Sequence, residues 1–270
     1  MIHVRAPATT ANLGPGFDCA GAALDLWNEL ELSEDGGEAD SEHLAVRAFA
    51  RLASPEGFGF SFTERIPRAR GLGSSAATVA LGLVAGAIAS GRPTDSEELL
   101  ALGLDLEGHP DNLAAALAGG VCLTWDGHIV RIADDAPGVP IAIVPREQLE
   151  TQAARAALPE TIAHRDAAFT VARAAMLGAA VASGSADLFA AAADDRLHEP
   201  YRAAHAPALA AVRERLPEGA LAATLSGSGP TVIVWARREA AAACVAELTK
   251  RFPETDVLHL SISPTGASRL

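Results

Sequence analysis

The stretch ARGLGSSAAT, residues 69–78, combines residue types that suit the binding of an anion. Gly71 and Gly73 can adopt backbone angles that other residues avoid, and they let an anion approach the main chain closely. Ser74 and Ser75 stand where an apolar run begins, which predicts the start of a helix. The first amides of a helix have no intrahelical partner and its dipole is positive at that end. The stretch predicts a phosphate site, although a helix cap after a plain turn explains the same residues equally well.

Lysine is nearly absent, which restricts how a phosphate can be bound. Lys250 is the single lysine, so the P-loop pattern GxxxxGK[ST] is excluded upstream of it. Backbone amides, arginine or a metal ion must then hold the phosphates. The net charge of −13 excludes nucleic acid as a favoured partner, because a phosphate backbone needs a cationic face. Such an acidic chain suits an enzyme that takes Mg²⁺ from solution.

Three further loops carry polar side chains suited to a small ligand. PATTANLGPGFD, residues 7–18, contains Asn12 and Asp18, and SGSGPT, residues 226–231, is a second glycine turn. HPDN, residues 109–112, places a histidine, an aspartate and an asparagine at a helix start. Each of these loops also has an explanation without a ligand. Asp111 at the start of a helix complements the helix dipole, which stabilises the helix by about 0.3–1 kcal/mol. A lone histidine such as His109 is more often structural.

The elements that must position these loops alternate between strand and helix in both halves of the chain. Its 270 residues are 49% hydrophobic, which is enough for a full core. We expect strands at Ile2–Ala6 and Ala23–Leu32, a long apolar helix at about Ser75–Ser90, a helix opened by a Thr94/Glu97 capping box, and a hairpin turning at Asp126-Gly127. The segment DDAPGVP predicts a domain boundary, with domains at residues 1–137 and 138–270.

The chain contains no sign of a disulfide framework, a zinc site or a membrane segment. Cys19, Cys122 and Cys244 are odd in number and far apart, which favours free thiols in a reducing compartment. The N-terminal MIHVRAPATT lacks the pattern of a signal peptide. The longest apolar run, Ala76–Ala89, is too short to span a bilayer. We therefore expect a soluble, cytoplasmic protein.

Taken together, the motifs resemble a known family. PATTANLGPGFD, GLGSSAA and SGSGPT are similar in order and spacing to the three motifs of the GHMP kinases, over essentially the whole chain. NLGPGFD, LEGHPDN and EPYR resemble the homoserine kinases within that family. The resemblance implies an α+β fold of two domains. The N-terminal domain is expected to be a two-layer α/β domain with a left-handed-type β-α-β unit, and the C-terminal domain a ferredoxin-like α/β domain.

The same resemblance implies an activity and a set of site residues. The implied reaction is phosphorylation of the side-chain hydroxyl of L-homoserine by ATP with Mg²⁺, giving O-phospho-L-homoserine, a step of threonine biosynthesis. Asp111 and Asn112 take the catalytic roles. The implied substrate-binding residues are Asn12, Asp18, His109, Asp111, Asn112, Thr151, Arg155, Arg202 and Gly227. The implied ATP-binding residues are Arg70, Gly71, Leu72, Gly73, Ser74, Ser75, Ala76 and Ala77, and the metal ligands are Ser75 and Glu107.

Several alternatives stay open from the sequence. Arg155 and Arg202 suit a substrate carboxylate, but they are equally explained as two ordinary arginines exposed on the surface. Glu107 alone suggests only a glutamate at a helix end. The function alternatives are another GHMP small-molecule kinase of the mevalonate or sugar type, and a non-catalytic regulator that binds nucleotide or amino acid on the same fold. His43 stands where relatives often carry asparagine, so no adenine contacts are assigned. By analogy with the family we expect a homodimer and no membrane partner.

Overall fold

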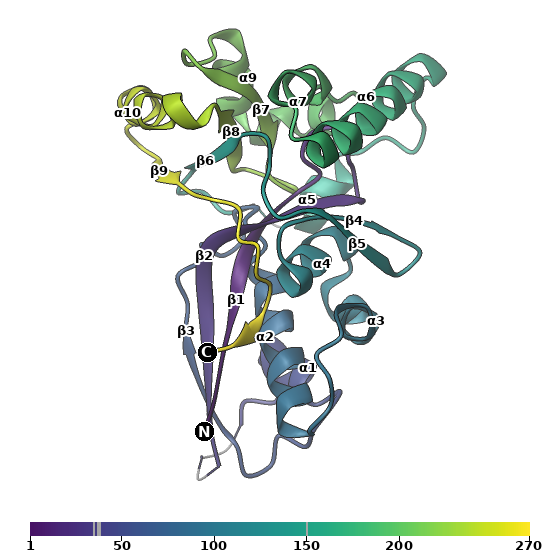
Figure 1. The fold of residues 1–270 in the computed structure, drawn as a ribbon, viewed down its shortest axis with the longest axis vertical. Coiled ribbons are helices and arrows are strands. Elements are labelled where there is room, and N and C mark those ends of the chain that lie inside the picture. The colour runs from purple at the N-terminus through teal and green to yellow at the C-terminus, as the bar shows by residue number, and fades with distance from the viewer. Residues whose placement is uncertain (35, 37–38, 150) are drawn as a thin grey trace.

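The computed structural model describes residues 1–34, 36, 39–149 and 151–270, without the side chains of residues 151–153. Two halves lie end to end along the long axis of the molecule, each with its own sheet (Figure 1). The mixture of helices and antiparallel sheets in two halves confirms the predicted α+β fold.

The first half is organised around one long strand pair. β1 (Ile2–Ala11) and β2 (Ala20–Ser33) run antiparallel, with Ile2 opposite Leu32 and Ala11 opposite Gly21. The strand order is β10-β1-β2-β4-β5, and β3 also pairs with β2. The other strands of this sheet are β3 (Gly59–Thr63), β4 (Val121–Trp125), β5 (His128–Ala133) and β10 (Ser268–Arg269). Asp126 and Gly127 both have positive φ between β4 and β5, as expected for the predicted hairpin turn.

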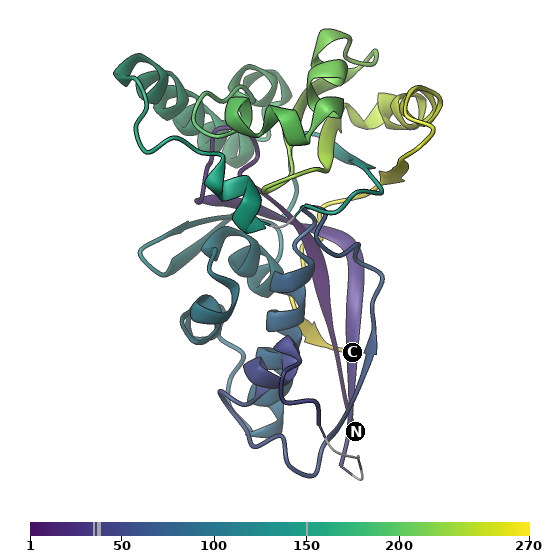
Figure 2. The same cartoon turned by 180° about the vertical axis from the view of Figure 1, so that it is seen from behind.

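Helices α1–α4 form a second layer on one face of this sheet, as both views show (Figures 1 and 2). The apolar helix α2 (Ser74–Ala89) lies at its centre and is buried over most of its length. A Cβ on Gly82 would stand 2.1 Å from the carbonyl oxygen of Ala45, so glycine lets α1 (Leu44–Phe49) cross α2 closely. The layer is completed by α3 (Ser96–Glu107) and α4 (Pro110–Ala118).

The start of α3 differs from the expected capping box. Asp95, not Thr94, is the N-cap, and its carboxylate accepts from the amides of Glu97 and Glu98 at 3.1 and 3.0 Å. An aspartate cap satisfies two free amides and adds negative charge at the positive end of the helix. The helix therefore begins at Ser96, close to the predicted position, with a different residue closing it.

Strands β3 and β4 each pair antiparallel with β2, so they run in the same direction. Helices α2 to α4 connect them, which makes a β-α-β connection of the kind that the family resemblance implied. The hand of that connection stays a prediction. Its consequence for function is that α2 and α4 both begin beside the upper end of β1, where the polar loops gather (Figure 1).

The second half is a four-stranded antiparallel sheet of order β7-β8-β6-β9 with helices around it. Its strands are β6 (Val139–Val144), β7 (Ala220–Leu225), β8 (Val232–Ala236) and β9 (Asp256–His259). Its helices are α5 (Thr151–Ala156), α6 (His164–Ser183), α7 (Ala186–Ala192), α8 (Glu199–Arg202), α9 (Pro207–Glu214) and α10 (Ala241–Arg251). In the described residues, no helix has both the length and the apolar character needed to cross a membrane.

We propose that the first domain ends at residue 137, because the second sheet starts with Val139. The last residues then leave the second half and return to the first. Ser263 N donates to Ala23 O at 2.9 Å, and β10 pairs with β1, placing Ser268 opposite Arg5. The chain end therefore ties the two halves together.

Candidate active site

The glycine loop presents a set of backbone amides at the start of α2. Gly73 is the N-cap with φ of 64°, and no side chain caps the helix. The first intrahelical bond runs from Ala77 N to Gly73 O at 2.9 Å, so the amides of Ser74, Ser75 and Ala76 precede the helical ladder. An uncapped N-terminus with a positive dipole is a suitable site for a phosphate.

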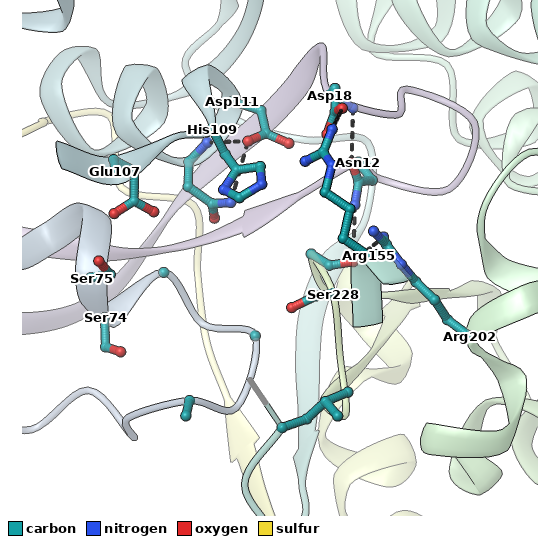
Figure 3. Close-up of a pocket in the computed structure, with 16 residues that line it drawn as sticks. Asn12, Asp18, Ser74, Ser75, Glu107, His109, Asp111, Arg155, Arg202 and Ser228 are labelled. Atoms are coloured by element: carbon teal, nitrogen blue, oxygen red, sulfur yellow. Dashed lines mark hydrogen bonds and ion pairs between the residues drawn. The ribbon is translucent and has the colours of Figure 1, made fainter. Parts of the chain in front are cut away.

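A cavity of about 230 Å³ opens directly beside these amides. Ser74, Ser75 and Glu107 lie on one side of it, and Asp18, Arg155 and Arg202 lie on the other (Figure 3). The full lining consists of Asn12, Asp18, Ala69, Gly71, Gly73, Ser74, Ser75, Glu107, His109, Asp111, Asn112, Leu149, Arg155, Arg202, Gly227 and Ser228. Most of the predicted site residues therefore face one common space between the two halves.

Two carboxylates face the cavity from different environments. Asp18 is partly exposed and forms an ion pair with Arg155. Asp111, in the first turn of α4, is only 2% exposed. Burial raises the pKa of Asp111 to about 6; the nearby charge of Asp18 adds to this rise, and hydrogen bonding from the amide of Asn112 opposes it. Both carboxylates therefore offer acceptors to a cation bound in the cavity.

Asn12 braces the loop that carries Asp18. Its amide nitrogen donates to Gly227 O at 2.9 Å, and its amide oxygen accepts from Asp18 N at 3.0 Å. Asn12 and Asp18 have φ of 69° and 53°, in the left-handed region that non-glycine residues seldom adopt. Such backbone conformations persist where surrounding contacts over-determine them, often at functional sites. In this structure the side chain of Asn12 supports the loop through both ends of its amide.

Asn112 and His109 flank Asp111 at the start of α4. Thr9 Oγ1 donates to Asn112 Oδ1 at 2.7 Å, which ties α4 to β1. His109 is the N-cap residue of α4 without a side-chain capping bond. Burial lowers the pKa of His109, with Arg155 adding to the effect, so a neutral imidazole is favoured there.

Two arginines supply positive charge to the cavity. Arg155 comes from α5 and pairs with Asp18 across the two halves. Arg202, in α8, is only 3% exposed, which excludes the surface-arginine interpretation. Its Nη1 lies 3.2 Å from both His198 Nδ1 and Gly227 O, and burial lowers its pKa. A guanidinium so held offers its planar fork to a carboxylate.

Glu107 and Ser75 fit the oxygen ligands that Mg²⁺ prefers. The hydroxyl of Ser75 lies near the carboxylate of Glu107 and favours its ionised form, and Glu107 Oε2 is buried and makes no hydrogen bond within the described part of the chain. Burial raises the pKa of Glu107 to about 7. A buried oxygen without a partner is costly unless a ligand satisfies it. No group of three or more His, Cys, Asp or Glu side chains placed to hold a metal occurs among the described residues.

A second, more open cavity of about 360 Å³ continues from the other side of the same serines. It is lined by Glu42, His43, Leu44, Glu64, Arg68, Ser74, Ser75 and Thr78. His43 caps α1 through Nδ1 and stacks on Phe62, with ring centroids 4.0 Å apart. The two cavities meet at Ser74 and Ser75, as expected if one ligand extends through both.

A few predicted residues lie elsewhere, and their roles stay predictions. Arg70 turns away, with Nη2 donating to Arg146 O at 2.7 Å. Leu72, Ala76 and Ala77 have buried side chains, so only their backbone is available, and the amide of Ala77 already donates to Gly73 O. The side chain of Thr151 lies outside the described residues.

Two residues that support the site were not predicted from the sequence. Phe17 has the guanidinium carbons of Arg155 and Arg202 over its ring, at 5.8 and 5.3 Å from the centroid. His198 stacks on Phe17 with centroids 5.1 Å apart and contacts Arg202. Both lie in or next to motifs that carry the family resemblance, GFD and HEPYR, so the signal for them in the sequence is their place beside Asp18 and Arg202.

Comparison with known families agrees with this geometry. The model of the GHMP kinase N-terminal domain matches residues 42–120, and that of the C-terminal domain matches residues 176–254. The fold and the site thus define a small-molecule kinase, and the chain belongs to the GHMP kinase family.

The relatives point to one branch of this family. The homoserine kinase of Moorella thermoacetica is 43% identical over 260 residues, covering 88% of each chain. That of Streptomyces coelicolor is 39% identical, covering 89% of this chain and 86% of its own. The crystal structure of homoserine kinase from Cytophaga hutchinsonii superposes with a TM-score of 0.87 at 28% identity, covering 100% of this chain and 97% of the other. A mevalonate kinase structure, at 14% identity and a TM-score of 0.75, shares the fold alone.

Proposed function

We propose that this protein is a homoserine kinase, which transfers the γ-phosphoryl group of ATP to the side-chain hydroxyl of L-homoserine. The observation that carries the proposal is one cavity, next to the start of α2, that is lined by two carboxylates, Asp18 and Asp111, and by two guanidinium groups, Arg155 and Arg202. An amino acid carries both an ammonium and a carboxylate, and it needs both kinds of partner. Mevalonate lacks the ammonium and a sugar lacks both charges, so neither explains this lining.

Each end of the substrate has a matching group. Asp18 and the buried Asp111 accept the ammonium, and Arg155 and Arg202 bind the carboxylate, with His109 beside them. The substrate displaces the internal ion pair of Asp18 with Arg155 and gives each partner a new counter-charge. Anchored at both ends, its side-chain hydroxyl points toward Ser74 and Ser75, where the phosphates lie.

Phosphoryl transfer depends chiefly on positioning and on neutralising the phosphate charge. Orientation of this kind is worth about 7–11 kcal/mol of barrier in favourable intramolecular systems. Asn112, fixed by Thr9, orients the attacking hydroxyl. Asp111 remains engaged with the ammonium, so the transfer proceeds without a dedicated strong base. The hydroxyl oxygen bonds to the γ-phosphorus as the bond to the β–γ bridging oxygen breaks, ADP leaves, and the hydroxyl proton passes to an oxygen of the transferred phosphoryl group.

The triphosphate of ATP binds the amides at the start of α2, and the nucleoside extends into the second cavity beside His43. Ser75 and Glu107 hold Mg²⁺, which when bound supplies positive charge against the phosphates. We further propose a cytoplasmic homodimer that serves threonine biosynthesis and binds neither nucleic acid nor membrane.

A coupled assay of ADP release tests the proposal with L-homoserine, L-threonine, mevalonate and galactose as acceptors. We expect turnover with L-homoserine to exceed that with the other three by at least about 100-fold, since each lacks a matched charge or a well-placed hydroxyl. Preference for mevalonate or galactose identifies a different kinase of the family. ATP binding without turnover of any acceptor identifies a regulator.

A further inference from the structure

His198 is a fully buried histidine that connects the two halves of the candidate site from behind the cavity lining. It is 0% exposed and directly precedes α8. Its Nε2 lies 2.8 Å from Gly14 O, in the loop of the first half that carries Asp18. Its Nδ1 lies 3.2 Å from Nη1 of Arg202, in the second half. The imidazole therefore stands between the loop for the ammonium and the arginine for the carboxylate.

These two contacts fix the tautomer of the ring. A carbonyl oxygen only accepts and a guanidinium only donates. Nε2 must then carry the hydrogen for Gly14, and Nδ1 must present its lone pair to Arg202. Asp195 competes weakly for Nε2 at 3.7 Å, and its Oδ2 already accepts from the amides of His198 and Glu199 at 2.7 and 2.9 Å.

We propose that His198, as the neutral Nε2–H tautomer, is a positioning residue that holds Arg202 in place for the substrate carboxylate, in register with the loop that carries Asp18. The inference rests on the proposed function. Arginine has a long flexible side chain, and ordering it before the substrate arrives lowers the entropic cost of binding. Nη1 of Arg202 is directed by two acceptors, His198 and Gly227, and Gly227 O also accepts from Asn12.

The ring and the backbone of His198 make different hydrogen bonds. Asp195 holds the backbone through the amides of His198 and Glu199, and it also accepts from Leu197 N at 2.9 Å. The ring contacts Gly14 O and the guanidinium of Arg202, whereas the carbonyl of His198 accepts from the backbone amide of Arg202, at 3.2 Å. Burial lowers the pKa of His198 to about 4, although the charge of Asp195 opposes this, so the ring is neutral at pH 7 and does not repel the guanidinium. Replacing only the ring is therefore an informative change.

Two conservative variants separate the two ring nitrogens. In His198→Asn the side-chain oxygen takes the position of Nδ1 and can still accept from Arg202. In His198→Gln the amide nitrogen takes the position of Nε2 and can still donate to Gly14. We expect His198→Gln to raise the KM for L-homoserine by about 10- to 100-fold, because a hydrogen bond to a charged donor is lost. We expect His198→Asn to change this KM by less than about threefold, since the acceptor remains.

A substrate analogue without the carboxylate gives a readout that a purely structural role does not produce. 3-Aminopropan-1-ol retains the ammonium and the hydroxyl, and it is measured as a competitive inhibitor against L-homoserine. In His198→Gln its Ki should change by less than about twofold, and the KM for ATP should change as little, because neither involves Arg202. A parallel loss for the analogue, or equal effects of Asn and Gln on the KM for L-homoserine, overturns the proposal.

The wild-type protein provides a second measurement that does not depend on how the variants fold. Long-range ¹H–¹⁵N correlation of the His198 ring, assigned through its own backbone resonances, identifies the protonated nitrogen. Protonation at Nε2 alone supports the inference, and an Nδ1–H tautomer or an imidazolium at pH 7 overturns it. Failure of the proposed function is a distinct result, because the unaltered protein then shows no turnover of L-homoserine at all.

Discussion

At the scale of single residues, the site sets two carboxylates in contrasting surroundings. Asp18 is paired with Arg155 and partly exposed, whereas Asp111 is buried at the start of α4. The ionised form of Asp111 is poorly solvated. The backbone amide of Asn112 donates to Asp111 Oδ1 at 2.8 Å, which compensates only in part for the lost water. In the proposed complex, the ammonium of L-homoserine supplies the missing counter-charge. The free protein then carries a local instability that the proposed substrate relieves, as is common for functional groups.

This instability predicts the effect of Asp111→Asn on unfolding. The pKa of Asp111 in the folded protein, about 6, exceeds the ordinary value of 3.8. Protonated Asp111 therefore stabilises the fold fully below pH 3.8, and this contribution is lost as the pH rises through 6. Asparagine keeps the acceptor for the amide of Asn112 without the charge. We expect similar free energies of unfolding for the two proteins near pH 4, and a variant more stable by about 1–3 kcal/mol at pH 7.5.

Denaturant titrations at several pH values, without substrate, measure this difference. A constant difference across pH 4–7.5 contradicts the prediction, because the burial of a charge then contributes nothing. The same variant tests the role of Asp111 in the reaction. We expect its KM for L-homoserine to rise, whereas a normal KM with a collapsed kcat identifies Asp111 as a general base.

Arg155→Ala tests the carboxylate end of the cavity. Removing one charged hydrogen-bond donor is expected to raise the KM for L-homoserine by about 10- to 100-fold, with the KM for ATP little changed. Arg165→Ala is the matched control, because the side chain of Arg165 is 85% exposed and pairs only loosely with its neighbour Asp166, at 3.6 Å. Steady-state kinetics with each substrate varied in turn separates the two variants. Equal effects in both, or an effect on ATP alone, exclude Arg155 from the substrate site.

The sequence predicted which residues gather at the site better than it predicted what each one contacts. Asp18, Asp111, Arg155 and Arg202 were expected from charge type and family resemblance, and they do line one cavity. The brace that Asn12 forms with Gly227 was not foreseen, because those residues are 215 positions apart. Burial of Arg202 was equally invisible, since exposure depends on the fold around a side chain and not on its own type.

At the scale of elements, the start of α2 has to fit against β1 and α4 at once. The predicted helix at Ser75–Ser90 begins one residue earlier, at Ser74, because Gly73 supplies the left-handed cap. The short helices α5 and α8 were not predicted, and together they carry Arg155 and Arg202. Helices of four to six residues show too little periodicity for a sequence pattern to reveal, and tertiary contacts hold them in place.

Gly73→Ala tests the fit of this helix start. A Cβ on Gly73 would stand 1.8 Å from Thr9 Oγ1 and 3.2 Å from Asn112 Oδ1, where those two side chains hydrogen-bond. The added methyl group would displace these two side chains. It would thereby shift Asn112 and the backbone amides at the start of α2, where we propose that the phosphates bind. We expect kcat/KM for ATP to fall by about 100-fold or more, because misplacement by about 1 Å has effects of that size.

Gly91→Ala is the control that separates the clash from backbone strain. Gly91 follows the same helix with φ of 66°, and beyond its two chain neighbours no described atom lies within 4 Å of its added Cβ. Both variants lose about 1 kcal/mol through the left-handed backbone. Only Gly73→Ala should lose activity, as measured by ADP release at saturating L-homoserine. Comparable activity of the two variants means that the loop accommodates the methyl group.

At the scale of the whole molecule, the site exists only where the two halves meet. The first half supplies Asp18 and Asp111, and the second supplies Arg155 and Arg202. One continuous hydrophobic cluster spans both halves, from Val4 in β1 to Trp235 in β8. The shared core predicts that the halves unfold together and that their relative position, hence the width of the cavity, is set by packing rather than by the linker.

The C-terminal return adds a second tie, and its removal predicts a loss of stability. Residues 264–270 bond to the first half through Ala267 N to Ala116 O at 2.7 Å and Leu270 N to His3 O at 2.8 Å, besides the pairing of β10 with β1. A chain that ends at Ser263 loses these contacts and exposes the edge of β1. We expect the free energy of unfolding to fall by about 1–3 kcal/mol, which lowers the midpoint of thermal unfolding by roughly 3–10 °C.

Deleting only Leu270 removes one of these bonds and should lower the midpoint by a third of that amount or less. Differential scanning calorimetry compares the three chains with and without L-homoserine, which bridges the halves and should stabilise each of them. If the chain ending at Ser263 melts at the wild-type temperature, the return strand contributes nothing and the shared core alone joins the halves. If it melts in two steps, the return strand is what makes their unfolding cooperative.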